Sequence, residues 1–478
     1  MRLWNKYKNM SAPAKASIWY TICNFFQKGI SFIVVPIYVR LLSTSEYGEW
    51  SVFQAWVNIL IIFASLNLYC GVFTKTLVDI PDSKERDKFT ASMQGLGTLT
   101  TLTMFVIYLC ARERINVAIG LNTKLMLLLF LYFLVYPAFS FWGARKRVEY
   151  QYRSMAVITV LVAVSTPGVS LLLLEFTKLR TTALILGYLL VQCIVGVVFF
   201  VIQFWKGKTF FKGAYWKYAL KFNIPLVPHY LSLIVLGQSD RIMIKHFCSE
   251  SDAGIYSFAY QIASAIIVLT SAINGSRVPW TYEQLKTGEY DRLRKISNML
   301  VVMVAGIALM VSLLSPEIIG ILGTNDYKSA VYVIPIVTLG SFFTFVYDMY
   351  ATLEFYYGAT KYVMYASVTG AVLNIALNAI FIPMFGFIAA AYTTLVCYIV
   401  FMLMHYHFSN KVVKMQGGRD SIYDTRKLFM ISLVTVVLCA GSMATFTVLL
   451  LRMVLIVGLI SVCLIKKRTI KELVLSMK

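Results

Sequence analysis

The chain has 478 residues, of which 59% are hydrophobic and only 14% are charged. Soluble domains are about half apolar and a quarter charged, so this composition excludes an ordinary soluble protein. The formal net charge is +22. Because the basic residues fall in short loops between apolar runs, as membrane topology requires, we expect no nucleic-acid partner.

The apolar residues form repeated runs of about 20 residues, the length that a helix needs to cross a bilayer core. The runs are continuous rather than alternating, so they predict helices, which satisfy their own backbone hydrogen bonds in lipid. The sequence predicts about fourteen spans, at residues 16–39, 50–73, 90–110, 125–143, 154–174, 182–204, 222–247, 253–274, 297–315, 330–353, 362–382, 387–408, 427–446 and 448–465. The last pair is the least defined, since Arg452 stands near its turn.

The distribution of lysine and arginine predicts the orientation of these spans. With the N-terminus in the cytoplasm, 33 of the 44 basic residues fall on the cytoplasmic side and 10 on the other, while Lys28 lies inside a span. Cytoplasmic loops carry the excess of basic residues in membrane proteins. We therefore expect both termini in the cytoplasm.

Two stretches that lie 206 residues apart, 42–51 and 248–257, resemble each other. Ser43, Ser45, Gly48 and Ser51 recur as Ser249, Ser251, Gly254 and Ser257. Both stretches join two predicted spans on the outer side, so the halves are repeats of the same orientation. Transporters built from such parallel repeats bind their substrate between the halves.

The predicted architecture is all-α and integral to the membrane. It has a six-helix bundle at 1–204, a cytoplasmic linker at 205–221, a second six-helix bundle at 222–408, and a loop with an additional helical hairpin at 409–478. The linker is basic and aromatic, which is typical of an amphipathic helix at the membrane surface.

The repeated stretches also predict local structure. Ser45 and Ser251 are expected to cap the helices that follow, with acidic residues beside them complementing the helix dipoles. Gly48 and Gly254 then lie near the start of these helices, where close helix packing would require a small residue.

Ionisable groups inside spans are costly and usually face a cavity or a partner. Lys28 lies on one stripe of the first span with Asn24 and Gln27, which predicts a polar face lining a cavity. Internal pairing for packing is the alternative.

Asp240 and Arg241 lie in the seventh span, either in the cavity or at the outer membrane edge. Arg277, near the cytoplasmic side, is a further cation that could meet an anionic substrate or lipid headgroup. Asp240 and Asp348 are the candidates for coupling to an ion, since that role requires a carboxylate that binds a proton or cation. Asn374 and Asn378, four residues apart, are expected to hydrogen-bond between helices.

Sequence features of enzymes are absent. The chain contains no Walker loop, Gly-rich dinucleotide turn, HExxH or GxSxG motif, and no predicted loop is long enough for a catalytic domain. The eight cysteines show no CxxC pair, so we expect small apolar packing residues. We expect no catalytic residue, cofactor or metal centre.

Three segments carry a resemblance to a known family. They are Arg40-Leu41-Leu42-Ser43 with Glu46-Tyr47-Gly48, Asp240-Arg241-Ile242-Met243 with the stretch 253–259, and Ile382-Pro383 with Gly386 and the alanines 389–391. Together with the repeat and the span count, they resemble the polysaccharide-transport branch of the MATE-like exporters, which contains the O-antigen flippases. The resemblance covers roughly residues 10–410.

The resemblance implies a flippase that moves an undecaprenyl-diphosphate-linked oligosaccharide from the cytoplasmic to the periplasmic leaflet of a bacterial inner membrane. It implies alternating access between two bundles and association with the polysaccharide polymerase and chain-length machinery. Lys28, Asp240 and Arg241 match the charged spans of such proteins. The alternatives are a multidrug or metabolite antiporter of the same superfamily, and a membrane glycosyltransferase or polymerase.

Overall fold

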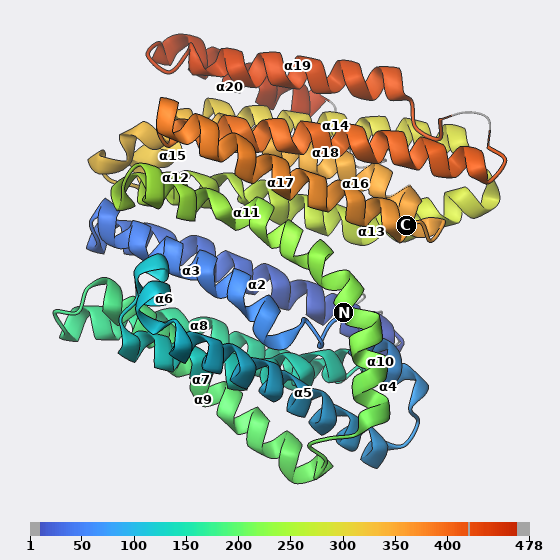
Figure 1. Ribbon diagram of the computed structural model, residues 1–478. Coiled ribbons are helices and arrows are strands. Elements are labelled where there is room, and N and C mark those ends of the chain that lie inside the picture. The colour runs from blue at the N-terminus through green and yellow to red at the C-terminus, as the bar shows by residue number, and fades with distance from the viewer. Residues whose placement is uncertain (1–9, 419–420, 466–478) are drawn as a thin grey trace. The chain divides into compact units, whose positions relative to one another are not determined.

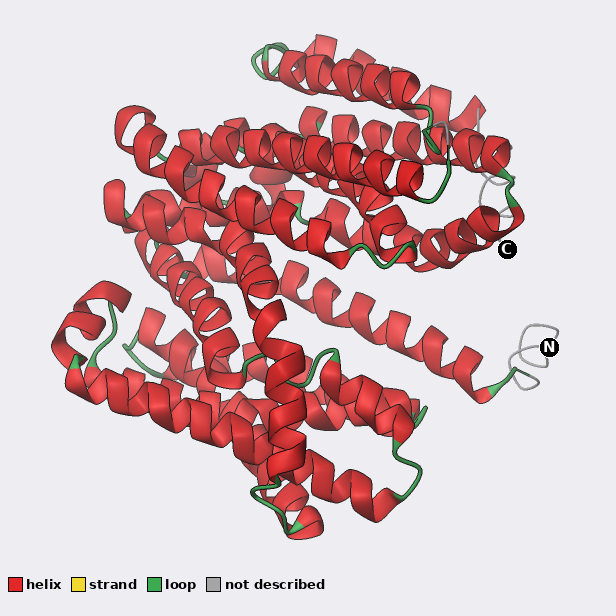
Figure 2. Cartoon of the chain, turned by 45° about the vertical axis from the view of Figure 1, so that its right-hand side comes forward, coloured by secondary structure: helices red, strands yellow, loops and turns green. Residues whose placement is uncertain are grey.

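The computed structural model describes residues 10–418 and 421–465, and every regular element in these ranges is a helix (Figure 1, Figure 2). The all-helical prediction is confirmed. The basic residues from Lys466 onward, Arg419, and those of the first nine positions lie outside the described residues.

The helices follow one another with short connections. As far as the linker they are α2 (Ala12–Leu41), α3 (Thr44–Ser65), α4 (Val72–Asp79), α5 (Ser83–Cys110), α6 (Arg112–Ile119), α7 (Thr123–Val148), α8 (Tyr152–Phe176) and α9 (Thr181–Gly207). The linker and the rest form α10 (Gly213–Asn223), η1 (Ile224–Leu226), α11 (Val227–Phe247), α12 (Glu250–Ala263), α13 (Ala265–Thr287), α14 (Tyr290–Leu313), α15 (Ser315–Leu322), η2 (Asn325–Tyr332), α16 (Ile334–Tyr356), α17 (Thr360–Phe385), α18 (Ile388–Met415), α19 (Thr425–Met443) and α20 (Leu449–Ile465).

Twelve helical segments of the described chain are long and apolar enough to cross a membrane, and they match twelve of the fourteen predicted spans. The second and last predicted spans correspond to α3 and α20. The 17 residues of α20 rise about 26 Å, slightly less than the hydrocarbon core of a bilayer.

The prediction of one continuous span over 50–73 is wrong at its C-terminal end. Helix α3 stops at Ser65 because Leu66 and Asn67 adopt positive φ angles of 47° and 51°, which a right-handed helix does not allow. A separate helix, α4, follows after the turn.

The chain forms two compact units. Within the described residues, unit 1 contains residues 10–34 and 49–234, and unit 2 contains residues 35–48, 235–418 and 421–465. In unit 1, α9 packs against α5, α7 and α8; in unit 2, α16 packs against α12, α14 and α18 (Figure 1). The division at residues 204, 221 and 408 that the sequence suggests stays a prediction.

The linker forms a helix over only part of its length. Helix α10 begins at Gly213 and packs on unit 1, where the Trp216 indole donates to the Ser92 carbonyl at 2.9 Å. Lys217 and Tyr218 are exposed on its other side. The two faces of α10 therefore differ in the way that an amphipathic helix requires.

The two repeated stretches begin with the same cap, two residues earlier than the sequence suggests. Ser43 Oγ accepts from the Glu46 N–H at 3.2 Å, and the Glu46 carboxylate accepts from the Ser43 N–H at 2.7 Å. Ser249 Oγ accepts from the Asp252 N–H at 3.0 Å. The prediction that Ser45 and Ser251 cap these helices is wrong. The S-x-x-E spacing of a capping box points to the correct residue.

Gly48 and Gly254 lie at a close crossing between the starts of α3 and α12, within unit 2. A Cβ atom at Gly48 would stand 1.8 Å from the Glu250 carbonyl oxygen, and one at Gly254 would stand 2.0 Å from that of Thr44. Since Thr44 and Glu250 are themselves equivalent in the repeat, the contact is reciprocal. The prediction that these glycines permit close packing is confirmed.

Candidate functional site

A fully buried carboxylate, Asp240 of α11, is the centre of a polar cluster in unit 2. It accepts hydrogen bonds from Asn378 Nδ2 at 2.7 Å, Thr394 Oγ1 at 2.9 Å and Asn374 Nδ2 at 3.4 Å, and from the Tyr256 hydroxyl. These partners come from α17, α18 and α12. A carboxylate inside an apolar bundle is costly unless such donors surround it.

A second layer of contacts fixes the two asparagine amides. Ser239 donates to Asn374 Oδ1 at 2.7 Å, and Thr393 donates to Asn378 Oδ1. The asparagines are four residues apart and so share one face of α17. Their predicted role in hydrogen bonding between helices is confirmed.

The cluster brings together oxygens of one carboxylate, two amides and several hydroxyls. Hard cations such as Na⁺ prefer oxygen ligands of this kind, whereas transition metals prefer imidazole or thiolate. Within the described ranges, no group of three or more histidine, cysteine, aspartate or glutamate side chains could hold a metal ion. The chemistry of the cluster suits a monovalent cation or a proton.

Arg241 points away from this cluster. Its guanidinium donates to the Gly237 carbonyl at 2.7 Å and to Gln238 Oε1 at 3.2 Å, and lies 4.5 Å from the ring centroid of Tyr260. Only 8% of Arg241 is exposed. Neighbours on a helix project about 100° apart, which explains why Asp240 and Arg241 serve different partners. Both are buried inside unit 2, and their placement in the cavity or at the outer membrane edge stays a prediction.

Arg277 and Asp348, predicted for different roles, form an ion pair between α13 and α16. Arg277 Nη2 lies 3.0 Å from Asp348 Oδ2, and Asn274 Nδ2 donates to the same oxygen at 2.7 Å. Thr352 accepts from Arg277 at 3.2 Å. Arg277 is 1% exposed, whereas the Asp348 side chain is 36% exposed. The aspartate therefore neutralises a buried guanidinium while one side of it stays accessible.

The polar stripe on the first span lies in unit 1. Asn24 and Lys28 of α2 are exposed and Gln27 is partly buried. Among the described residues, Lys28 forms no ion pair or side-chain hydrogen bond, in contrast to Arg241 and Arg277 of unit 2. Internal pairing, the alternative explanation for Lys28, therefore has no partner in the described part of the chain.

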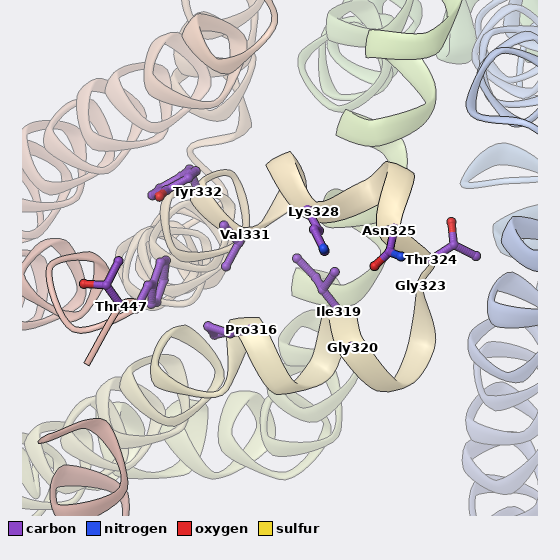
Figure 3. A pocket seen from close by; sticks show the side chains of 11 residues that line it. Pro316, Ile319, Gly320, Gly323, Thr324, Asn325, Lys328, Val331, Tyr332 and Thr447 are labelled. Carbon is purple, nitrogen blue, oxygen red and sulfur yellow. The ribbon is translucent and has the colours of Figure 1, made fainter. Parts of the chain in front are cut away.

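A separate cavity of about 600 Å³ opens in unit 2 between α15, η2 and the turn before α20 (Figure 3). Asn325, Lys328 and Tyr332 line it from η2, and Ile319 and Thr447 lie opposite. None of the residues predicted from sequence lines this cavity.

Sequence reasoning missed Tyr256 and Thr394 as partners of Asp240. Tyr256 lies within the stretch 253–259 noted for its family resemblance, and Thr394 follows the alanines 389–391; each places a hydroxyl within an apolar run. That pattern indicates a polar contact within a bundle, but it does not identify the partner.

The family model described as polysaccharide biosynthesis protein matches residues 14–285, more than half of the chain. The chain belongs to this family. A MatE model also matches residues 225–380. The protein is therefore a multi-pass membrane protein of the polysaccharide biosynthesis family.

Relatives and solved structures agree with this assignment. An uncharacterized membrane protein of Haemophilus influenzae is 25% identical over 376 residues, covering 74% of this chain and 86% of its own. A probable low-salt glycan biosynthesis flippase, Agl15 of Haloferax volcanii, is 24% identical and covers 84% of each chain. The lipid II flippase MurJ in an inward closed conformation has the same fold, with a TM-score of 0.68 at 15% identity over 95% of this chain and 100% of its own.

Proposed function

We propose that this polysaccharide biosynthesis protein flips an undecaprenyl-diphosphate-linked oligosaccharide, an O-antigen or similar repeat unit, from the cytoplasmic to the outer leaflet of a bacterial inner membrane. The family match carries the proposal, and the probable low-salt glycan biosynthesis flippase Agl15 among its relatives supports it. A diphosphate sugar headgroup cannot cross hydrocarbon unaided, because burying each unpaired polar group costs several kcal/mol. A polar cavity that alternates between the two sides removes this barrier without chemistry.

Lys28 is our candidate for receiving the diphosphate, with Asn24 and Gln27 beside it on α2. Its ammonium has no described partner, so an anion would meet a charge that is not already neutralised. Arg241 and Arg277 are already held by neighbouring groups of unit 2 and are nearly fully buried, so we rank them below Lys28 as contacts for the substrate. The polyprenyl tail stays in lipid, and both termini face the cytoplasm, where the glycan is assembled.

The Asp240 cluster is our candidate for coupling flipping to an ion gradient. Its oxygens can bind Na⁺, or Asp240 can bind a proton in its place. Asp348 is the weaker candidate because Arg277 already balances its charge. Association with a polysaccharide polymerase and chain-length proteins belongs to the same proposal.

Gene deletion tests the substrate class. We expect loss of surface glycan and accumulation of the lipid-linked repeat unit in the cytoplasmic leaflet. Normal glycan together with altered sensitivity to cationic drugs would instead favour the multidrug antiporter.

Variants of Lys28 test the site in the same deletion strain. Lys28→Ala should fail to restore surface glycan, while Lys28→Arg restores it. The matched control is Lys124→Ala, which removes an exposed lysine of α7. Full complementation by Lys28→Ala would contradict the role of Lys28.

Cation binding is tested on the purified protein, without a flipping assay. Relative to equimolar choline chloride, sodium chloride should raise the free energy of unfolding by about 2.7 kcal/mol at roughly 100 times the Kd, and the unfolding temperature should rise with it. Asp240→Asn should remove this difference. Stabilisation by sodium that persists in Asp240→Asn would place the cation elsewhere.

A further inference from the structure

A second buried ionisable pair, Glu354 of α16 and His405 of α18, has no part in the proposed mechanism. His405 Nδ1 lies 2.9 Å from Glu354 Oε1. Each residue has 0% of its surface exposed. Glu354 Oε2 and His405 Nε2 are also buried, and neither has a hydrogen-bond partner among the described residues. Among the described residues, Glu354 and His405 therefore hydrogen-bond through their side chains only to each other.

Aromatic rings surround the imidazole. Tyr347 stacks on His405 with the ring centroids 5.4 Å apart, and Phe401 packs edge-on at 4.6 Å. Tyr347 and Glu354 are two turns apart on α16, while Phe401 and His405 are one turn apart on α18. Because these spacings place each pair on one face of its helix, the contact between α16 and α18 encloses the ionisable groups.

Several charged or titratable side chains on the helices around the pair have partners elsewhere. Arg277 of α13 binds Asp348, Arg294 of α14 donates to the carbonyls of Ser421 and Ile422, Tyr256 of α12 donates to Asp240, Lys427 of α19 binds Asp424, and Lys361 and Lys411 lie over the ring of Tyr362 on α17. In the described chain, Tyr347 is the titratable group in direct contact with the imidazole, and no third charge forms an ion pair with Glu354 or His405.

The cost of burying a net charge determines how many protons the pair holds. In water above pH 7, a glutamate is ionised and most of a histidine is neutral, so the two together carry one negative charge. An unbalanced charge buried in a membrane bundle costs several kcal/mol. One added proton makes the pair neutral overall, whether it rests on the imidazole or on the carboxylate.

We infer that Glu354 and His405 form a proton-binding site, which holds one proton while α16 and α18 enclose it and returns that proton to water when the pair becomes hydrated. Helix α16 ends at Tyr356, two residues beyond Glu354, at the end that the lysine and arginine distribution predicts to be cytoplasmic. Proton exchange with the cytoplasm therefore needs water to reach about one helical turn into unit 2. This site is separate from the Asp240 cluster.

The pH dependence of unfolding tests proton binding without reference to transport. If the folded pair holds one proton that the unfolded chain lacks, the unfolding equilibrium constant rises about tenfold per pH unit above pH 7. The double variant Glu354→Gln/His405→Gln is uncharged at every pH and should lack this component in SDS-induced unfolding. Equal slopes for the wild-type protein and the double variant would overturn the proposal.

Hydrogen exchange at the C2 atom of histidine, read by mass spectrometry, tests the wild-type protein even if the double variant does not fold. The exchange rate of each histidine has its own midpoint in pH, and His407 on the same helix is the internal reference. Because His405 is buried against Glu354, we expect its exchange to depend on pH differently from that of His407. The same pH dependence for both histidines would contradict proton binding by the pair.

The use of this proton in transport rests on the proposed flippase function. Proteoliposomes that hold the purified protein and a lipid-linked oligosaccharide should carry protons from one side of the membrane to the other as flipping proceeds, and Glu354→Gln should flip with less proton movement. Proton movement that Glu354→Gln leaves unchanged would contradict coupling at this site. Absence of flipping by the wild-type protein would refute the proposed function, while the unfolding and exchange measurements would still decide whether the pair binds a proton.

Discussion

The crossing of α3 and α12 predicts that Gly48→Ala and Gly254→Ala destabilise the protein to a similar extent. Each added Cβ would stand 1.8 or 2.0 Å from a backbone carbonyl oxygen of the other helix. Carbon and oxygen atoms rarely approach within about 3 Å, so the helices must separate by roughly 1 Å or more. A backbone atom cannot rotate away as a side chain can.

The magnitude follows from the contacts at this crossing. Overpacking of a close contact costs about 1–3 kcal/mol. Separation also strains the hydrogen bonds between Thr44 and Ser251, 2.7 Å apart, and from Ser45 to Glu250 at 3.1 Å, each worth about 1 kcal/mol. We expect each single variant to lose about 2–4 kcal/mol of unfolding free energy.

Denaturant unfolding in detergent micelles measures this loss. Gly275→Ala in α13 is the control, since nothing lies within 4 Å of its added Cβ, and alanine favours a helix over glycine by about 1 kcal/mol. The double variant should lose less than the sum of the two, because helices already moved apart accept the second methyl. Single variants as stable as the control, or strictly additive losses, would refute the reciprocal contact.

Three further predictions concern the charged groups of unit 2. Asp348→Asn leaves the buried Arg277 guanidinium without a counter-charge and should cost about 3–5 kcal/mol in denaturant unfolding. Arg277→Met should cost less, because the Asp348 side chain that it leaves unpaired is 36% exposed and can be hydrated. Asp424→Ala removes the cap of α19 and should lower the free energy of unfolding by about 1 kcal/mol, while Asp424→Asn costs little. The side-chain hydrogen bond from Lys427 lowers the pKa of Asp424, so the stabilisation by the ionised carboxylate is complete above about pH 4. A stability difference between the wild-type protein and Asp424→Ala that grows as the pH falls would contradict this reasoning. The Arg452 guanidinium donates to the Phe446 carbonyl at 2.8 Å and binds Glu317 of α15, so Arg452→Met should make the α19–α20 hairpin more accessible to limited proteolysis. Unchanged cleavage would argue that these contacts do not hold the hairpin in place.

The sequence predicted the architecture well because lipid imposes simple rules on composition. Runs of about 20 apolar residues can only be spanning helices. Twelve of the predicted spans appear as helices of sufficient length and hydropathy. The residue pattern was also enough to place Gly48 and Gly254 at a close contact, since a repeated glycine near a helix start is readable without coordinates.

Local boundaries were harder to predict. The end of α3 depends on the positive φ angles of Leu66 and Asn67, and leucine gives no sign of such a conformation. The caps at Ser43 and Ser249 were misplaced by two residues, although their spacing to Glu46 and Asp252 carries the signal. The sequence therefore contains the signal for these two caps in the spacing of each serine to the acidic residue three positions later.

The sequence alone determined the all-helical membrane class, the repeat and the charged residues within spans. Only the tertiary structure decided which charges meet: Asp240 with Asn378, Arg277 with Asp348, and Glu354 with His405. The physical reason is that these helices are apolar around most of their circumference, so periodicity does not tell which face meets which neighbour. The polar contacts that distinguish one packing from another join residues 51 to 138 positions apart, and folding alone brings them together.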